Sequence, residues 1–364
     1  MRPRPTGGRT PEQSADMMPL SNPLQWCLLV GATLLFTALF MVAGLPGATL
    51  LGPMAAAILL GVRGASIELP KRFSWLAQAL TGGVVARSMD VTILHDVALH
   101  WFPMLMALST MLAGAVLVGW LLERSGRFPG GTALWGTMPG AAPAMIAMAG
   151  DFGGDPRFVA VMQYLRVIVV VVLASLVCHF LLGSVPAPIA VPGAVPAPSA
   201  SVASTLALVA VALAGGWAGT VTRLPAGALL GPILLGGTLN MTGLVVLDSP
   251  SWLIAVAFTI IGWTTGLRFR RELLRDLVAS VPLMLLSTFG LVAMSLGSAW
   301  LLVTLTGKDA LTAYLATSPG GLDSVTVVAL GSAADVPFIL TLQTLRLFGT
   351  ILMSVLLVRF LRRR

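Results

Sequence analysis

Twelve apolar segments follow one another along this chain, most of about 20 residues, which is the length of helix that crosses the hydrocarbon core of a bilayer. They lack the strict apolar/polar alternation of membrane-barrel strands. Hydrophobic residues make up 57% of the chain and charged residues only 10%, whereas soluble domains carry about 25% charged residues. We therefore predict an all-α polytopic membrane protein. The segments lie at 24–44, 47–62, 73–90, 97–122, 130–150, 158–183, 203–222, 224–240, 252–267, 279–306, 310–333 and 337–358.

The two halves of the chain resemble each other in sequence. LPGATLLGP at 45–53 matches LPAGALLGP at 224–232, and the stretch 138–166 matches the stretch 318–346. A match at a nearly constant offset indicates an internal duplication, which is typical of transporter folds. The aligned identities include Pro139/Pro319, Gly140/Gly320, Asp155/Asp335, Phe158/Phe338, Gln163/Gln343 and Arg166/Arg346.

This duplication sets the predicted domain organisation. Each repeat is expected to hold about five spanning helices plus one re-entrant or broken segment. Between the repeats, closely spaced prolines cannot continue a helix and favour an extended linker. The predicted parts are a disordered cytoplasmic tail (1–23), membrane repeat 1 (24–183), a Pro/Ala-rich linker (184–202), membrane repeat 2 (203–360) and a basic C-terminal tail (361–364).

The distribution of Lys and Arg predicts the topology, because basic residues concentrate in cytoplasmic loops. Leaving out Arg166 and Arg346, 20 basic residues remain; if all twelve segments crossed, 13 would lie inside and 7 outside. If the fifth segment of each half returns on the side it entered, 18 lie inside and only Arg87 and Lys308 outside. We therefore expect ten crossings, two inverted repeats, and both termini on the cytoplasmic side of a bacterial inner membrane.

The fifth segment of each half is too short to cross. From Pro139 to Gly150, and from Pro319 to Gly331, about 12 residues would form a helix of about 18 Å, against a hydrocarbon core of about 30 Å. Proline suits the first helical turn and glycine permits a sharp break before it. We expect non-helical backbone at 137–140 and 317–321, close to the segments QYLR (163–166) and QTLR (343–346).

Each of these two segments places a Gln and, three residues later, an Arg on one face of an apolar helix. An intramembrane charge is costly and by default marks a substrate or ion path, and guanidinium suits a carboxylate. The alternative is that each Arg only binds the exposed carbonyls of the broken helix; the sequence leaves both open. The candidate substrate-binding residues are Arg166, Arg346, Gln163, Gln343, Pro139, Gly140, Ser318, Pro319, Gly320 and Gly321.

Four acidic residues are candidates for coupling transport to H⁺ or Na⁺. Asp155 and Asp335 each stand within two residues of a Pro at the start of the sixth segment, where a carboxylate commonly caps a helix N-terminus, and capping is the favoured interpretation. Asp323 aligns with Pro143, and Asp151 aligns with a glycine, so either would be a coupling group present in only one half.

The repeated LLGP segment is expected to be a small-residue packing surface with a Pro kink, with a pathway role as the alternative. His95, His100 and His179 form no ligand cluster in the sequence, so we expect no metal, no cofactor and no enzymatic activity. No polar region is large enough for a DNA-reading module, so the expected partners are membrane lipids, a small anionic solute and a coupling ion, not nucleic acid.

The duplicated LLGP block, the Pro-Gly segment and the Q-x-L-R ending together resemble the AbrB-duplication family of bacterial membrane proteins, over residues 25–360. Members of that family are labelled as transcriptional regulators or as ammonia monooxygenases. The resemblance therefore implies an indirect link to gene expression through a membrane sensor. We prefer a secondary transporter, because it explains the repeat, the half-helices and the paired arginines together. Repeat 1 departs from the fuller SPGGL pattern of repeat 2, which questions symmetric use of the two sites.

Overall fold

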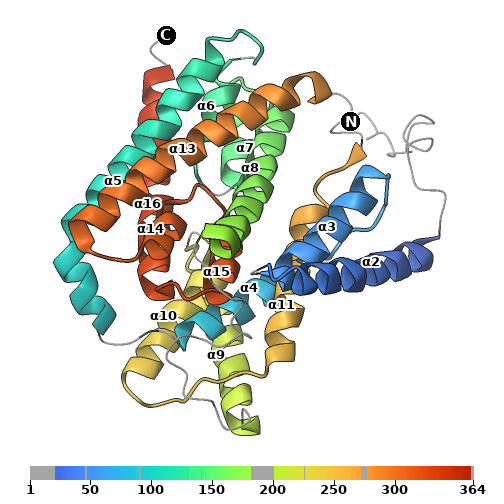
Figure 1. Ribbon diagram of the computed structural model, residues 1–364, viewed down its shortest axis with the longest axis vertical. Helices are drawn as coiled ribbons and strands as arrows, with labels where there is room; N and C mark the ends of the chain where they lie inside the picture. The colour runs from blue at the N-terminus through green and yellow to red at the C-terminus, as the bar shows by residue number, and fades with distance from the viewer. Residues whose placement is uncertain are drawn as a thin grey trace, which may run out of the picture.

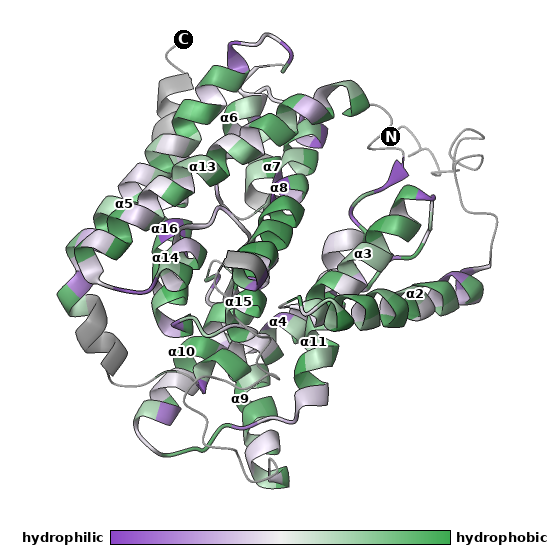
Figure 2. Cartoon of the chain, in the orientation of Figure 1, coloured by the Kyte–Doolittle hydropathy of each residue, from purple (hydrophilic) through white to green (hydrophobic). Residues whose placement is uncertain are grey.

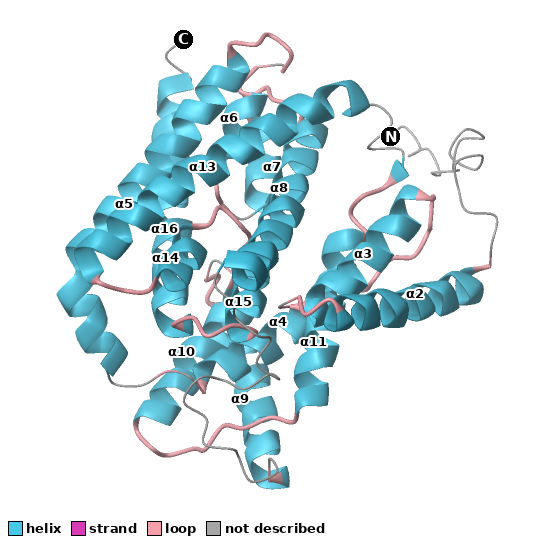
Figure 3. Ribbon diagram, in the orientation of Figure 1, coloured by secondary structure: helices cyan, strands magenta, loops and turns pink. Residues whose placement is uncertain are grey.

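The computed structural model describes residues 21–45, 47–87, 89, 92–128, 130–140, 142–181, 201–224, 226–271 and 277–361. Within these ranges, all regular secondary structure is helical (Figure 3). The expected N-terminal tail, the Pro/Ala-rich linker and the basic C-terminal tail lie outside the described residues, apart from the few residues at their edges.

Every predicted apolar segment contains helix, which confirms the all-α prediction, and the fifth segment of each half is divided into two short helices. The first half contains α2 (Asn22–Val42), α3 (Ala48–Val62), α4 (Lys71–Ala86), α5 (Thr92–Glu123), α6 (Thr132–Thr137), α7 (Ala142–Asp151) and α8 (Pro156–Leu176). The second half contains α9 (Val202–Val221), α10 (Gly227–Met241), α11 (Ser251–Gly266), α13 (Val281–Thr306), α14 (Ala310–Thr317), α15 (Leu322–Leu330) and α16 (Val336–Leu361).

The helices carry the apolar exterior of a membrane protein. Six of those described, α2, α5, α8, α9, α13 and α16, are long and apolar enough to cross a bilayer, whereas α3, α10 and α11 are apolar but have only 15 to 16 residues. Large apolar side chains point outward from the long helices, among them Leu34, Trp217 and Trp300, which are 65 to 70% exposed. Figure 2 shows hydrophobic residues, in green, along much of the coloured part of these helices. Such surfaces are stable in lipid rather than in water.

The helices form two bundles, and each bundle takes helices from both halves of the sequence (Figure 1). The first three helices of each half, α2–α4 and α9–α11, pack together and carry both LLGP segments, so we call them the LLGP bundle. The remaining helices, α5–α8 and α13–α16, form the Q-x-L-R bundle. Helix α15 packs on α4 and α11 and so connects the two bundles.

Corresponding helices make corresponding contacts across the halves. In the LLGP bundle α3 packs on α2 and on α11, while α10 packs on α9 and on α4. In the Q-x-L-R bundle α5 packs on α13, α8 on α13, and α16 on α5. The two halves are therefore interlocked within each bundle, and neither half buries its apolar helix faces alone.

The LLGP segments are close-packing surfaces. A Cβ added at Gly52 would lie 2.2 Å from Thr37 Oγ1, and one added at Gly231 would lie 2.0 Å from the carbonyl oxygen of Gly215. The helices can approach this closely only because glycine has no side chain. These contacts support the packing interpretation of LLGP, with Pro53 and Pro232 inside the helices as expected.

Candidate functional site

Two breaks in the helices form the centre of the Q-x-L-R bundle. The backbone is non-helical at 138–140 between α6 and α7, and at 318–321 between α14 and α15. The residue before each Pro is extended, with ψ of 125° at Met138 and 138° at Ser318, because a following proline disfavours the helical region. The predicted interruptions are confirmed, except that Thr137 and Thr317 are still the last residues of their helices.

In the first half, Gln163 and Arg166 bind the end of α6. Gln163 Nε2 donates to the carbonyl oxygens of residues 135, 136 and 138, at 3.0 to 3.3 Å. Arg166 Nη1 donates to the carbonyls of residues 137 and 138, at 3.2 and 3.1 Å, and its Nη2 donates to Gln163 Oε1 at 2.7 Å. The Gln and the Arg therefore act as one unit on the break.

The second half repeats this arrangement at the end of α14. Gln343 Nε2 donates to the carbonyl oxygens of Leu315 and Ser318, at 2.9 and 3.2 Å. Arg346 donates from Nη1 to the carbonyl of Ser318 at 2.6 Å and from Nη2 to that of Gly320 at 2.8 Å. The predicted proximity of the breaks to the two Q-x-L-R faces is thus confirmed in both halves.

These contacts show what the two arginines do structurally. The last carbonyls of a helix have no partner within the helix and form the negative end of its dipole. Inside a membrane no water is at hand to satisfy them, so a buried guanidinium at that position stabilises the break. Of the two interpretations of the arginines, carbonyl binding is observed directly in this conformation.

The carbonyls do not use all the hydrogen-bonding capacity of the site. Arg166 and Arg346 are 3% and 4% exposed, and neither has a carboxylate partner among the described residues. Nε of each Arg, and Gln343 Oε1, are buried without a hydrogen-bond partner in that part of the chain. An anion placed between the two guanidinium groups would accept from these free N–H groups.

The two breaks lie close together across the helices that bear the arginines. Thr350 Oγ1, on α16, lies 3.5 Å from the carbonyl oxygen of Pro139. A Cβ added at Gly140 would lie 2.9 Å from Thr350 Cγ2. A Cβ at Gly320 would correspondingly lie 3.0 Å from Val170, on α8. Pro139 and Gly140 of the first break thus lie against α16, and Gly320 of the second break lies against α8.

A small cavity of about 10 Å³ lies between the breaks, lined by Pro139, Thr317 and Pro319 among others. This volume suits about one water molecule and is too small for a carboxylate. The predicted substrate-binding residues are therefore brought together, but in a closed arrangement.

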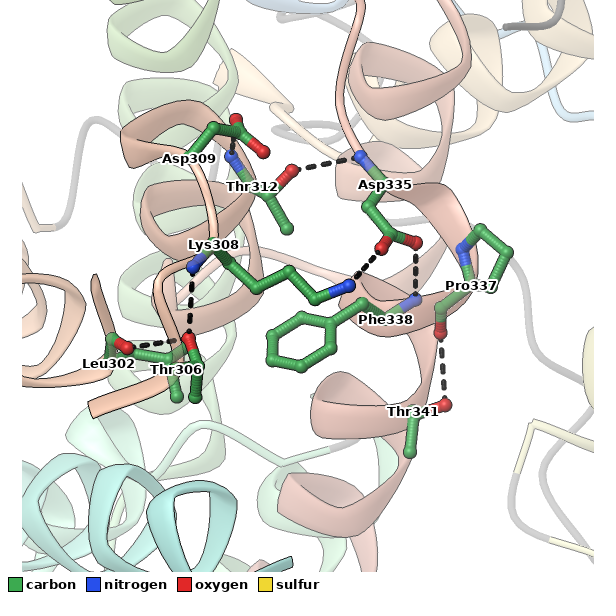
Figure 4. A network of polar contacts seen from close by, with 9 residues as sticks. All are labelled: Leu302, Thr306, Lys308, Asp309, Thr312, Asp335, Pro337, Phe338 and Thr341. Atoms are coloured by element: carbon green, nitrogen blue, oxygen red, sulfur yellow. Dashed lines mark hydrogen bonds and ion pairs between the residues drawn. The ribbon is translucent and has the colours of Figure 1, made fainter. Parts of the chain in front are cut away.

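Asp155 and Asp335 cap helices, as the favoured interpretation predicts. Asp155 accepts from the backbone N–H of Arg157 at 2.8 Å, and Asp335 accepts from that of Phe338 at 3.1 Å. Partial burial raises the pKa of Asp155, but the hydrogen bonds and charge of Arg157 outweigh this and lower it below its usual value. In Figure 4, Lys308 Nζ also donates to Asp335, at 2.9 Å. These two carboxylates lie at helix starts, not at the breaks.

Asp323 and Asp151 have different surroundings. Asp323 is half-buried in the first turn of α15, directly after the second break, and its Oδ2 accepts from Gln78 Nε2 at 3.0 Å. Asp151 is exposed at the C-terminal end of α7. Only Asp323 therefore adjoins the candidate site.

Sequence reasoning missed a second, larger cavity in the LLGP bundle. It has a volume of about 590 Å³ and is lined by parts of α4, α10 and α11, including Lys71, Ser74, Gln78, Arg268 and Arg270. The basic residues among these entered the sequence analysis only as topology markers. Their position at the ends of unusually short apolar helices was the signal that could have pointed to a recess.

Comparison with known proteins gives one consistent relationship. A family model described as "Transition state regulatory protein AbrB" matches residues 49–362. The chain is 42% identical over 338 residues to "Putative regulator AbrB" of Escherichia coli (strain K12), covering 93% of this chain and 97% of that protein. It is 25% identical over 288 residues to "Uncharacterized protein YhjN" of Bacillus subtilis (strain 168), covering 76% and 75%. No solved structure matches the chain.

Proposed function

The chain belongs to the AbrB family, and from this premise we propose that it is a secondary transporter-like integral membrane protein for a small anionic, carboxylate-type solute. The observation that carries the proposal is the pair of buried arginines at two adjacent helix breaks. Each retains an unpartnered Nε within the described residues. Broken helices at the middle of a duplicated membrane fold are the usual setting of a transporter's substrate site.

In this proposal the two arginines alternate between two sets of acceptors. In the closed arrangement described above their Nη groups bind backbone carbonyls and leave little room between the breaks. In a solute-bound state the breaks separate, and the guanidinium groups and the start of α15 face the carboxylate. Helix N-termini and guanidinium groups both favour anions. The binding free energy therefore comes from charge attraction and from planar, bidentate hydrogen bonds between arginine and carboxylate.

The proposed topology is ten crossings with inverted repeats and both termini in the cytoplasm. The short helices α3, α4, α10 and α11 then cross with help from their flanking residues, because 15 to 16 residues span only about 24 Å. Under this topology Arg270 lies on the cytoplasmic side and Lys308 on the outer side.

Cysteine-accessibility mapping tests that arrangement. With Cys27 and Cys178 replaced by Ser, we expect Arg270→Cys to react with an impermeant thiol reagent only from the cytoplasmic side, and Lys308→Cys only from outside. Reaction of position 270 in intact cells would contradict the proposed topology, and position 308 serves as the positive control for outside labelling.

Asp323 is the proposed coupling group, because it adjoins the second break and Gln78. We expect Asp323→Asn to reduce solute accumulation driven by a proton or sodium gradient to the equilibrium level. Asp151→Asn removes an exposed carboxylate away from the site and serves as the matched control, with accumulation unchanged. If Asp323→Asn still accumulates solute as the wild type does, coupling lies elsewhere.

The function itself is tested by uptake of radiolabelled small carboxylates into proteoliposomes, with and without imposed gradients. Saturable uptake of one of them supports a transporter. If a carboxylate binds the purified protein without being taken up, the alternative is favoured, a membrane sensor that affects gene expression through another protein. The name of the Escherichia coli relative is the reason for this alternative.

A further inference from the structure

The larger cavity is a recess at one end of the LLGP bundle. Its wall is formed by the first two turns of α4, the start of α10 and the end of α11. Because these helices have only 15 to 16 residues, their ends stop short of the about 30 Å hydrocarbon thickness and leave space between them. A volume of about 590 Å³ lies within the range typical of small-molecule sites.

The charges around this recess are unbalanced. Lys71, Arg268 and Arg270 line it together with one acidic residue, Glu68, which pairs with Arg270 at 2.5 Å. Lys71 and Arg268 have no carboxylate partner at ion-pair distance in the described part of the chain. With Asp323 at the inner end counted beside Glu68, the three cations still leave an excess of positive charge at the recess, which attracts anions. Ser74 and Gln78 add neutral polar groups to the same wall.

Two contacts connect the recess to the Q-x-L-R bundle. At its inner end Gln78 donates to Asp323, at the start of α15 and two residues after the second break. At its rim Arg268 Nη1 donates to the hydroxyl of Tyr164 at 2.9 Å, and Tyr164 is the neighbour of Gln163 on α8. Two hydrogen bonds thus connect the recess to the Q-x-L-R bundle, one of them close to the second break.

We propose that this recess is a binding vestibule for small soluble anions such as carboxylates or phosphate, held by Lys71 and Arg268. Its further role, as the entrance through which the anion passes Gln78 and Asp323 to reach the buried arginines, rests on the proposed function. Anion binding in the vestibule does not rest on the proposed function. Anion binding and the role as an entrance are therefore tested separately. Trp75 on the vestibule wall provides an apolar surface for the carbon skeleton of an organic acid.

The charge selectivity of the vestibule is measurable by thiol chemistry. In the background free of native cysteine, Ser74→Cys is placed on the vestibule wall and the exposed Thr242→Cys outside it. Each purified variant is reacted with an anionic and with a cationic methanethiosulfonate reagent of similar size. We expect the anionic-to-cationic rate ratio to be about tenfold higher at position 74 than at position 242, since charged clefts raise association rates by about tenfold or more.

The matched test replaces the cationic residues that line the vestibule by neutral ones, to show whether they cause the selectivity. Adding Lys71→Gln and Arg268→Gln to Ser74→Cys is expected to bring the rate ratio down to that of position 242. Both replaced side chains are exposed, so the melting temperature is expected to stay close to that of the parent, and Lys71→Gln alone serves if it does not. A ratio at position 74 equal to that at 242, or one insensitive to neutralisation, overturns the proposal.

Competition by soluble anions distinguishes a binding site from general electrostatic attraction of ions. Millimolar succinate or inorganic phosphate is expected to slow labelling of position 74 severalfold at constant ionic strength, with chloride as the reference salt. Equal effects of all three anions would overturn a binding vestibule. Protection seen only in nanodiscs of anionic lipid, and not with soluble anions in zwitterionic lipid, would assign the recess to a lipid headgroup and also overturn it. These measurements do not depend on transport. If the vestibule is selective for anions but no carboxylate is taken up, anion binding in the vestibule stands and only the vestibule's role as an entrance is rejected.

Discussion

Arg346→Lys is expected to lower both the melting temperature and the affinity for a transported carboxylate. Arg346 donates from two different nitrogens to the carbonyls of Ser318 and Gly320, which lie on either side of Pro319. The single ammonium group of lysine lacks the planar fork that spans both acceptors. A hydrogen bond to a charged donor contributes about 1.5 to 3 kcal/mol, so losing one of the two should cost about 2 kcal/mol of stability.

The measurement compares ligand affinity and melting temperature in the same purified samples. Arg166→Lys, the equivalent change at the first break, is the internal comparison and should give an effect of the same kind. If Arg346→Lys melts lower but binds the carboxylate as the wild type does, the arginine has only the structural role. The proposal of an anionic substrate would then lose its main support.

Gly231→Ala is expected to prevent formation of the LLGP bundle, although it adds only one methyl group. That methyl would lie 2.0 Å from the carbonyl oxygen of Gly215 on α9, so the two backbones would have to separate. Overpacking a well-packed interior typically costs about 1 to 3 kcal/mol, and here the obstacle is rigid backbone rather than a movable side chain. We expect a large loss of folded protein from the membrane.

The control for this substitution is Gly297→Ala on α13, where nothing lies within 4 Å of the added Cβ. It introduces the same chemical change in another apolar helix and should leave yield and melting temperature unchanged or slightly higher, because alanine is the better helix former. Size-exclusion profiles and thermal melts of the two variants give the comparison. A normally folded Gly231→Ala protein would show that α9 and α10 are not held at glycine contact distance.

The sequence predicted the helix breaks because their cause is local. A proline forces the residue before it out of the helical region, and Met138 and Ser318 adopt that extended conformation. The Q-x-L-R spacing likewise placed each Gln and Arg on one helix face. It could not determine what that face would meet, so carbonyl binding and ligand binding remained open until the ends of α6 and α14 were placed against it.

The larger cavity could not be predicted in this way. Lys71 and Arg268 belong to different halves, and only the packing of α4 on α11 brings them to one recess. Local patterns carry no information on such a pairing of helix ends. The small volume between the breaks was equally outside sequence reasoning, because it depends on how far apart the two breaks lie within the Q-x-L-R bundle in one particular conformation.

The interlocked bundles also bear on how such a chain could arise. Helix α3 of the first half is covered by α11 of the second, and α10 of the second by α4 of the first. A polypeptide of one half alone would therefore expose a helix face shaped for its counterpart, and would have had to associate with a second copy of itself to cover it. Joining the two halves in one chain makes that association intramolecular and independent of concentration, and it lets the halves differ at single positions, as Asp323 opposite Pro143 illustrates.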